Sequence, residues 1–530
     1  MKNLMFAVGM ALTLSAGAAT KTIAPGESWT ATDANVADFD TYEVQAASGD
    51  KAAGLLLLDL SATPTVTLTG GGEVRKVSSA TWTYNDTTKA QASFAGRFVI
   101  ASGIVQFDNG TTESALGGSS STPVVTNGAT MVWNTSSLDY SRMLHLSGRG
   151  AKDGDGNDLG AFRLTKQNGS TSGMNKFSLD GDTLMVITCN YLFWGNSGAS
   201  KLNGHKLEKA GPGIIYAYGG SLTGDEGSVE LQAGKSGSTT KLHIREGYNF
   251  GTASDGPLIL NDYTYVALQN DAKSDRPLVV KGSQSVVIEL SNQYGSYSTA
   301  WTESTRYFGG PITLEDGAML TAKAPNANQT PRSLSFKGKI SGAGGITASG
   351  SGRVYVSNPE NDFTGTLTVD GTSGGETYLA SASVLPDYSH LTVKNAGRVT
   401  VPFSDDTAWP ASSVAALAAQ ADWQGSGNIL ALDFGELTDC RRELSFTDFT
   451  VPAGGAMGFG AEGVDPSAEL TVLAPALGWC GFGAWSSTLR FAGDERYELG
   501  TLTAAAAGGH PAGEILFDGA TDVWLTTNAP

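Results

Sequence analysis

The chain has 530 residues, with 34 basic and 52 acidic side chains and a formal net charge of −18. An acidic surface of this kind repels phosphate backbones, so nucleic acid is not an expected partner. Hydrophobic residues make up 40% of the chain, which is too many for a disordered protein, and the 69 glycines lack the every-third-residue period of collagen. The composition therefore favours a folded protein with many strands joined by tight turns.

The first 18 residues have the pattern of a secretory signal peptide. Lys2 supplies the positive charge, Leu4 to Leu14 the apolar run, and Ala16-Gly17-Ala18 the small-residue cleavage pattern. The apolar run is shorter than the ~20 residues that a membrane-spanning helix needs. We therefore expect export, with no transmembrane segment after signal cleavage and a location outside the cell or on its outer surface.

Residues 19–65 are expected to form an N-terminal cap. They include Trp29, Tyr42 and the apolar run Leu55 to Leu58, and they carry few turn signals. A stack of coils needs such a cap, because its first coil otherwise exposes an open strand edge.

Residues 66–410 carry a repeated pattern, which is clearest from Ile346 to Val401. Short runs with alternating apolar and polar residues, such as Arg353 to Val356 and Leu391 to Lys394, are separated by Gly, Asn and Asp. Alternation with a period of two residues predicts strands, not helices. The same order of runs recurs at Leu207 to Gly224, and shorter echoes at Pro257 and Pro277 suggest one coil for about twenty residues.

The turn residues explain how such runs can build a coil. Glycine adopts a positive φ at little cost, and Asn and Asp adopt it more readily than other residues do. Placed after each short strand, they redirect the chain, and each coil then stacks on the last at ~4.8 Å. The apolar residues of each run are expected to point inward, where only stacked neighbours can bury them.

These units resemble the autotransporter-associated β-helix repeat, in which a Gly-x-Gly run precedes an aromatic-Thr-Gly run and a Val-x-x-Gly run. The resemblance is carried by Leu207 to Gly224 and by Ile346 to Gly371. It implies an all-β, right-handed parallel β-helix with terminal caps, displayed outside a bacterial cell as a passenger. Family members end in a translocator barrel, and the sequence after Val401 shows no such pattern, so self-translocation is not expected.

The run from 411 to 421 is predicted to be a short helix. Ser412 or Ser413 can cap it, and an apolar face is formed by Val414, Leu417, Ala418 and Ala421. Residues 422–530 are strand-like again but less regular. They are expected to form either further coils with a terminal cap or a small C-terminal β domain.

The three cysteines are too few for a disulfide framework. Cys440 and Cys480 can pair within the C-terminal region, whereas Cys189, close to the apolar run Leu184 to Ile187, is expected to be a buried thiol. There is no Cys-x-x-Cys pair and no cluster of His and Cys, so no metal site is expected.

Two groups of aromatic residues are candidates for ligand binding. The first group lies in one polar stretch and could stack on sugar rings in an extracellular glycan: Tyr294, Tyr297, Trp301 and Tyr307. The alternative is a loop that packs its own rings against the coils. The second group is expected to be an internal or surface stack: Tyr191, Phe193, Trp194, Tyr216 and Tyr218.

Three further motifs lack residues or a structural context that their functions require. Asp153 to Asp158 begins like a calcium loop but lacks its glycine and its final glutamate, so a solvated turn is favoured. Gly371 to Gly375 has the spacing of a nucleophile elbow, and Gly458 to Gly463 has that of a dinucleotide fingerprint, but neither has the required strand–turn–helix context.

No cofactor is therefore expected, and the prediction is a non-enzymatic surface or secreted protein that acts in adhesion or glycan binding. The five histidines are isolated in the sequence. The alternative is a polysaccharide-active hydrolase or lyase, because such enzymes place clustered acids on one outward face of adjacent coils.

Overall fold

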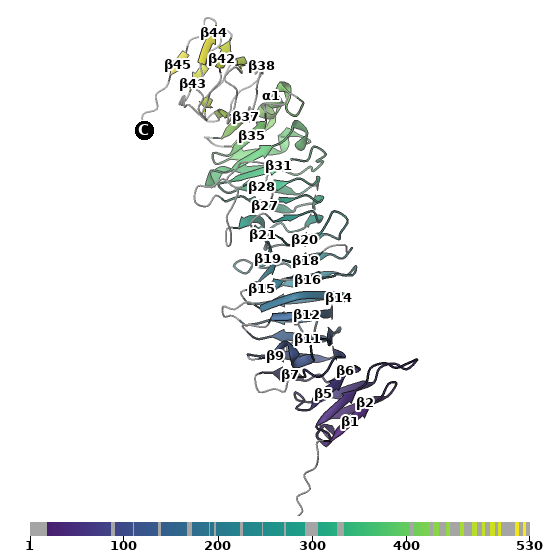
Figure 1. The fold of residues 1–530 in the computed structure, drawn as a ribbon. Coiled ribbons are helices and arrows are strands. Elements are labelled where there is room, and N and C mark those ends of the chain that lie inside the picture. The colour runs from purple at the N-terminus through teal and green to yellow at the C-terminus, as the bar shows by residue number, and fades with distance from the viewer. Residues whose placement is uncertain are drawn as a thin grey trace, which may run out of the picture. The chain divides into compact units, whose positions relative to one another are not determined.

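The computed structural model describes most of the chain up to residue 433 and short strands beyond it. The described part runs from 19 to 433 with gaps at 86–90, 110, 136–138, 167–171, 190, 196–197, 223–225, 246, 270–271, 292–305, 326–332, 403–406 and 425–427. Strands pair in parallel and stack as a β-solenoid of about 14 turns, which confirms the predicted all-β, parallel β-helical fold (Figure 1). The chain divides into two units, Met1–Thr165 and Lys166–Pro530.

The first unit contains three parallel ladders of strands. The first ladder is β1 (Thr20–Ile23), β3 (Thr41–Val44) and β5 (Thr67–Gly70). The second is β2 (Ser28–Thr32), β4 (Leu55–Asp59), β6 (Glu73–Lys76), β8 (Arg97–Ile100), β10 (Thr122–Val125) and β12 (Asp139–Gly148). The third is β7 (Thr81–Tyr84), β9 (Gly103–Phe107), β11 (Ala129–Trp133) and β13 (Phe162–Leu164). The segment 19–65, expected as a cap, thus already carries coil strands in parallel pairs.

The second unit also contains three main ladders, here named A, B and C. Ladder A is β14 (Ser172–Ile187), β16 (Leu207–Ala210), β18 (Val229–Leu231), β20 (Leu258–Leu260), β23 (Leu278–Val280), β26 (Ile312–Leu314) and β29 (Ile340–Gly342). Ladder B is β15 (Tyr191–Trp194), β17 (Ile214–Ala217), β19 (Thr240–Arg245), β21 (Thr264–Gln269), β24 (Val286–Ser291), β27 (Met319–Lys323), β30 (Gly345–Ser349), β32 (Leu367–Asp370), β34 (Leu391–Lys394) and β36 (Asp422–Gln424).

Ladder C begins later and continues to the end of the described chain. It consists of β22 (Lys273–Ser274), β25 (Tyr307–Phe308), β28 (Ser333–Phe336), β31 (Arg353–Val356), β33 (Glu376–Leu379), β35 (Arg398–Pro402), β37 (Ile429–Asp433), β39 (Ala456–Gly460), β41 (Cys480–Phe482), β43 (Tyr497–Leu499) and β45 (Val523–Leu525). Beside it, a fourth set pairs in parallel: β38 (Arg441–Ser445), β40 (Glu469–Leu473), β42 (Thr488–Ala492) and β44 (Ile515–Asp518). The described strands after residue 422 thus also pair in parallel.

Inward-facing residues form continuous apolar columns. One column in ladder A places branched side chains in register on successive coils, each at most 1% exposed: Leu207, Val229, Leu258, Leu278, Ile312 and Ile340. Burial of each such side chain contributes roughly 1.5–3 kcal/mol to the free energy of unfolding. The coils above and below provide this burial, so each coil depends on its neighbours. The Cys189 thiol, 7% exposed, is buried as expected.

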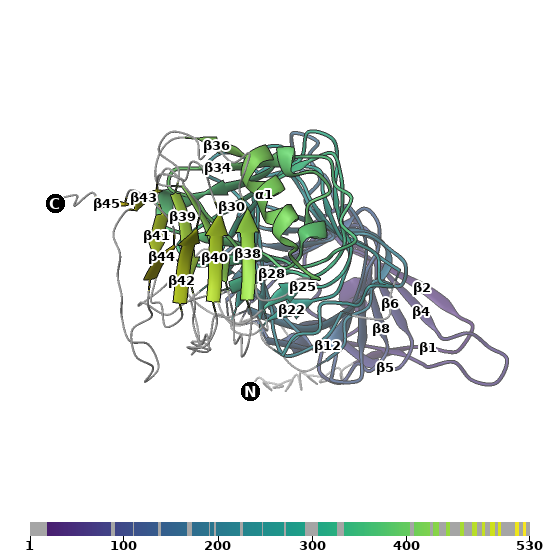
Figure 2. The ribbon, with the colours of Figure 1, turned by 90° about the horizontal axis from the view of Figure 1, so that it is seen from above.

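Helical structure is confined to short segments of the described chain. Helix α1 (Ala411–Gln420) lies where the sequence predicts a helix, and it buries Val414 and Leu417. Figure 2 shows α1 next to β38, with β40 and β42 side by side beyond it. Single turns of 3-10 helix occur at η1 (Val36–Asp38), η2 (Glu113–Leu116), η3 (Gly371–Ser373), η4 (Ala382–Val384) and η5 (Tyr388–His390).

Buried cations satisfy backbone carbonyls at the corners of the coils. In the second unit, Lys209 Nζ donates to the carbonyl oxygens of Gly211 and Gly213 at 2.5 and 2.6 Å. In the first unit, Lys76 Nζ donates in the same way to the carbonyl oxygens of Ser78 and Ala80. A corner leaves carbonyls outside the strand ladders, and a buried carbonyl without a donor is costly. The sequence analysis did not single out these two lysines.

Lys209 makes the stability of the second unit depend on pH. Burial, and then the nearby Lys241 cation, lower the pKa of Lys209 to about 7 in the folded chain, whereas an unfolded lysine titrates near 10.4. Between these values the unfolded chain binds a proton that the folded chain releases, so stability rises with pH. We expect a gain of about 2 kcal/mol in the free energy of unfolding between pH 7 and pH 9.

Urea unfolding of the wild type and of Lys209→Met at pH 7, 8 and 9 measures this contribution. The variant should lack that part of the pH dependence, whatever its stability at pH 7. Lys281→Met is the matched control, because Lys281 is 42% exposed and pairs with Glu315 at the surface; it should keep the wild-type slope. Equal slopes for the wild type and Lys209→Met would contradict the assignment.

Candidate functional site

The candidate site is the outer row of ladder C, defined as Tyr307, Ser335, Tyr355 and Tyr378. These four residues occupy the same register position on strands β25, β28, β31 and β33. Because parallel strands in a stack lie ~4.8 Å apart, the row runs along the stacking direction of the coils. The next residue on each strand points inward and is buried: Phe308, Phe336, Val356 and Leu379. Strand alternation therefore places the tyrosines on the outer face.

Two tyrosines and an arginine form one end of the row. The Tyr355 and Tyr378 rings are 4.7 Å apart between centroids and tilted by 41°. The Arg353 guanidinium lies 5.6 Å from the Tyr355 ring and 5.3 Å from the Tyr378 ring, and it donates to the Tyr355 hydroxyl at 2.9 Å. Tyr355 is 4% exposed, whereas Tyr378 is half-buried. Tyr355 thus packs against Tyr378 and accepts a hydrogen bond from Arg353, and the Tyr378 ring is partly exposed to solvent.

Glu376, on β33, contacts side chains on the coils before and after its own. Its Oε2 accepts from Arg353 Nε at 2.9 Å, and its Oε1 lies 3.5 Å from Arg398 Nε. The Thr400 hydroxyl also donates to Oε1. With 8% exposure and both oxygens engaged, this carboxylate is a structural partner of the two guanidinium groups.

Tyr307 and two lysines form the other end of the row. Lys337 Nζ lies 4.6 Å from the centroid of the Tyr307 ring, and Lys273 Nζ lies 6.0 Å from it. Both distances fall within the range of cation–π attraction. Tyr307 and Lys337 are half-buried, and Lys273 is exposed. One aromatic ring and two lysine side chains therefore lie together at this end of the row.

The structure describes one of the four residues predicted to bind a glycan. Tyr307 lies in the outer row of ladder C, on β25. The others, Tyr294, Tyr297 and Trp301, lie outside the described residues, so their role stays a prediction. The sequence analysis missed Tyr355 and Tyr378. The signal for them was a tyrosine at the third position of two strands, in Arg-Val-Tyr-Val and Glu-Thr-Tyr-Leu.

The second aromatic group forms a stack on the outer face of ladder B, as expected. Tyr191 and Phe193 each lie within 5.6 Å of the Tyr216 ring, and Tyr216 lies 4.7 Å from His243 on the next coil. Tyr216 and His243 are only 3% and 5% exposed. From the same group, Trp194 faces the core at 0% exposure, and Tyr218 is 38% exposed.

Burial also governs the titratable groups of this stack. Burial, and then the cations Lys241 and Lys209, lower the pKa of His243 to about 4, and its Nδ1 lies 3.0 Å from Gln269 Nε2. Burial raises the pKa of Glu289, although Lys323 opposes the shift. The imidazole is therefore neutral at physiological pH and packed between rings, which suits a structural role better than ligand binding.

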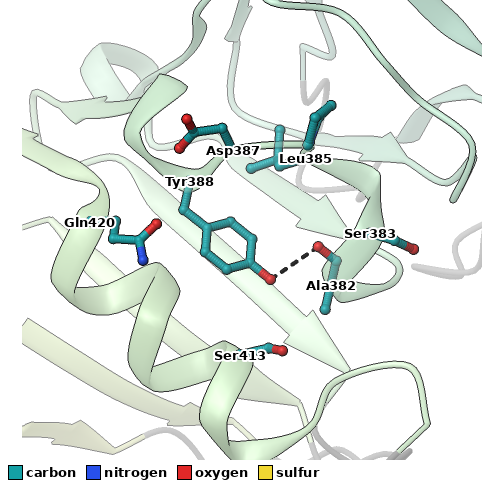
Figure 3. A pocket seen from close by; sticks show the side chains of 8 residues that line it. Ala382, Ser383, Leu385, Asp387, Tyr388, Ser413 and Gln420 are labelled. Atoms are coloured by element: carbon teal, nitrogen blue, oxygen red, sulfur yellow. Dashed lines mark hydrogen bonds between the residues drawn. The ribbon is translucent and has the colours of Figure 1, made fainter.

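A pocket of about 610 Å³ lies where α1 meets η4 and η5 (Figure 3). The Tyr388 ring crosses it and donates its hydroxyl proton to the Ala382 carbonyl at 3.0 Å, while its face stacks on Trp409 at 6.1 Å. Asp387, the one charged residue in the lining, accepts from the Ser389 backbone N–H at 2.9 Å. Both polar side chains are thus engaged with backbone groups of η4 and η5, which favours a structural role for this pocket.

Two of the motifs set aside in the sequence form turns. Asp153 accepts from the backbone N–H groups of Asp155 and Asn157, and Asp158 pairs with Arg149 and Lys152. Gly371–Ser373 is the 3-10 turn η3, capped by Asp370. Within the described ranges, no three His, Cys, Asp or Glu side chains are placed to hold one metal ion.

The fold and the outer row define a β-solenoid with an aromatic and basic strip on one face. No protein-family model, no curated protein and no solved structure matches this chain. Among the residues that the structure describes, no helix is both long enough and apolar enough to cross a membrane.

Proposed function

We propose that this β-solenoid is an exported, non-enzymatic protein that binds an extended polysaccharide along the outer row of ladder C. The observation that carries the proposal is the shared register of Tyr307, Tyr355 and Tyr378, which sets aromatic rings along the stacking direction. Sugar rings stack on the apolar faces of tyrosine, and a row of rings suits a long chain better than a single sugar.

The contacts of Glu376 support binding without hydrolysis. A general acid has to reach the glycosidic oxygen, and a second carboxylate has to lie on the other side of the bond. Both oxygens of Glu376 are occupied by Arg353, Arg398 and Thr400. Export rests on the signal-peptide pattern of residues 1–18, and the likeness to the autotransporter-associated repeat supports display at a bacterial surface.

Removing the two accessible rings of the row should weaken polysaccharide binding. Each ring face contributes about 1 kcal/mol, so the double variant Tyr307→Ala/Tyr378→Ala should lose roughly tenfold or more in affinity. Calorimetry against a panel of neutral and charged polysaccharides measures the effect. The same mixtures, assayed for new reducing ends and unsaturated sugars, should show no product.

Tyr218→Ala provides the matched control. Tyr218 is 38% exposed and has the Arg245 guanidinium 4.4 Å from its ring, but it is not part of the outer row. The Tyr218→Ala variant should bind the polysaccharide with the affinity of the wild type. An equal loss of affinity in both variants would show that the row is not the binding site. Turnover of any polymer would show that the protein is a polysaccharide-active enzyme.

A further inference from the structure

Two tyrosines of the outer row lie against each other on neighbouring coils. Tyr355 on β31 and Tyr378 on β33 share one register position, and their ring centroids are 4.7 Å apart. This separation matches the strand spacing of ~4.8 Å, which means that the two side chains extend from the sheet in the same direction. Like atoms of the two rings therefore face each other across the coil boundary, including the Cε carbons beside the hydroxyl groups.

Neighbouring side chains hold the two rings in this position. Arg353 donates to the Tyr355 hydroxyl oxygen at 2.9 Å, and its guanidinium lies 5.3 Å from the centroid of the Tyr378 ring. Glu376 in turn accepts from Arg353 Nε at 2.9 Å. Tyr355 is 4% exposed, whereas Tyr378 is half-buried. One ring of the pair is thus open to a reagent in solution, and the other is in contact with it.

A second contact between tyrosines on neighbouring coils has a different geometry. The Tyr191 and Tyr216 rings are 5.6 Å apart between centroids and meet edge to face, with 84° between their planes. The two residues do not share a register position, because Tyr191 pairs with Ile214 and Tyr216 pairs with Phe193. Their like atoms therefore do not lie opposite each other, and this contact serves as an internal comparison for the first.

We propose that Tyr355 and Tyr378 are a site of oxidative cross-linking, at which a bond between their Cε atoms joins and stabilises the coils of β31 and β33. The oxidant is hydrogen peroxide, which a haem peroxidase uses to remove electrons one at a time. Each phenol loses one electron and its hydroxyl proton, and the two phenoxyl radicals couple. The hydrogen on each bonded Cε then moves to the phenolic oxygen, which restores both aromatic rings. The two electrons and two protons convert one hydrogen peroxide into two waters.

Contact between the rings allows both to be oxidised through the exposed one. The oxidant takes an electron from Tyr378, and Tyr355 replaces it across the contact. A second electron is then removed at Tyr378, which leaves two radicals side by side. Radicals held in this way couple before either meets another molecule, so the product is a cross-link within one chain. The reaction is independent of polysaccharide binding, and it suits an exported protein, because the space outside the cell is oxidising.

The test treats the full chain with hydrogen peroxide and a haem peroxidase at low protein concentration. Mass spectrometry should find a monomer that has lost two hydrogen atoms, and the fluorescence of dityrosine should appear with it. Cleavage at acidic residues between the two rings, such as Asp362 and Asp370, should release two peptides that remain joined through Tyr355 and Tyr378. A treated chain without this joined pair, or a link found only between two chains, would overturn the proposal.

Tyr355→Phe and Tyr378→Phe should each abolish the joined pair of peptides, because phenylalanine has no hydroxyl group to oxidise. Both variants keep the packed ring, and circular dichroism checks that they fold. Tyr191→Phe is the matched control and should give the joined pair in the wild-type yield. An equal yield of a link between Tyr191 and Tyr216 in the wild type would overturn the assignment, because ring contact without a shared register would then be enough.

The cross-link should also stabilise the second unit. It closes a loop between neighbouring coils, which restricts the unfolded chain more than the folded one. Peroxide treatment should therefore move the midpoint of urea unfolding to a higher urea concentration in the wild type. The same treatment should cause no such shift in Tyr378→Phe. An unchanged midpoint for the cross-linked chain would overturn the stabilising role of the link.

Discussion

Replacing Arg276 by Met should lower the free energy of unfolding of the second unit by about 3–5 kcal/mol. Arg276 is completely buried, and its guanidinium donates to the carbonyl oxygens of Phe250, Gly227, Gly256 and Leu222 at 2.9, 2.9, 2.5 and 3.1 Å. Met keeps much of the volume but leaves four buried corner carbonyls without this donor. Hydrogen bonds from a charged group contribute about 1.5–3 kcal/mol each, and an unsatisfied buried carbonyl adds a desolvation cost.

Urea unfolding together with hydrogen–deuterium exchange measures this effect. Exchange should accelerate first in β18, β20 and β23, because Arg276 links the coils to which these strands belong. Arg149→Met is the control. Arg149 is 52% exposed and pairs with Asp158, so its loss should cost under about 1 kcal/mol. If the two substitutions cost the same, the buried arginine does not stabilise the corners.

Gly338→Ala should destabilise the second unit by about 3 kcal/mol or more. A Cβ at Gly338 would lie 1.7 Å from the carbonyl oxygen of Gly310 on the preceding coil. The neighbouring atom is backbone, and both coils are held at the strand spacing of ~4.8 Å, so neither can move aside without breaking ladder hydrogen bonds. The cost is therefore steric and comes from the stacking of coils.

Gly317→Ala separates this steric cost from the cost of an unusual backbone angle. Gly317 has φ +74° but no atom within 4 Å of an added Cβ, so the substitution should cost only about 1 kcal/mol. Thermal unfolding of both variants under the same conditions gives the comparison. A larger loss at Gly317 than at Gly338 would show that conformational cost, not contact between coils, explains the glycines.

The candidate site was only partly predictable from the sequence. Tyr307 was found because aromatic residues are concentrated near it, whereas Tyr355 and Tyr378 were missed because each is a lone tyrosine in its strand. Coil length is not constant: Leu258 pairs with Leu278, but Leu278 pairs with Ile312. Loops of unequal length between strands hide which tyrosines share a register, and only the paired coils show it.

The sequence by itself determined the strands, the glycine-rich corners and the parallel stack, because alternation and turn chemistry are local properties of the chain. It also placed helix α1 near residue 411. Only the tertiary structure decided which outward residues meet across coils and which cations enter the interior. Arg276 is buried because corner carbonyls from distant parts of the sequence, at Gly227 and Leu222, converge on it, and that convergence exists only when the coils are stacked. Lys209 binds the carbonyls of Gly211 and Gly213 in its own corner.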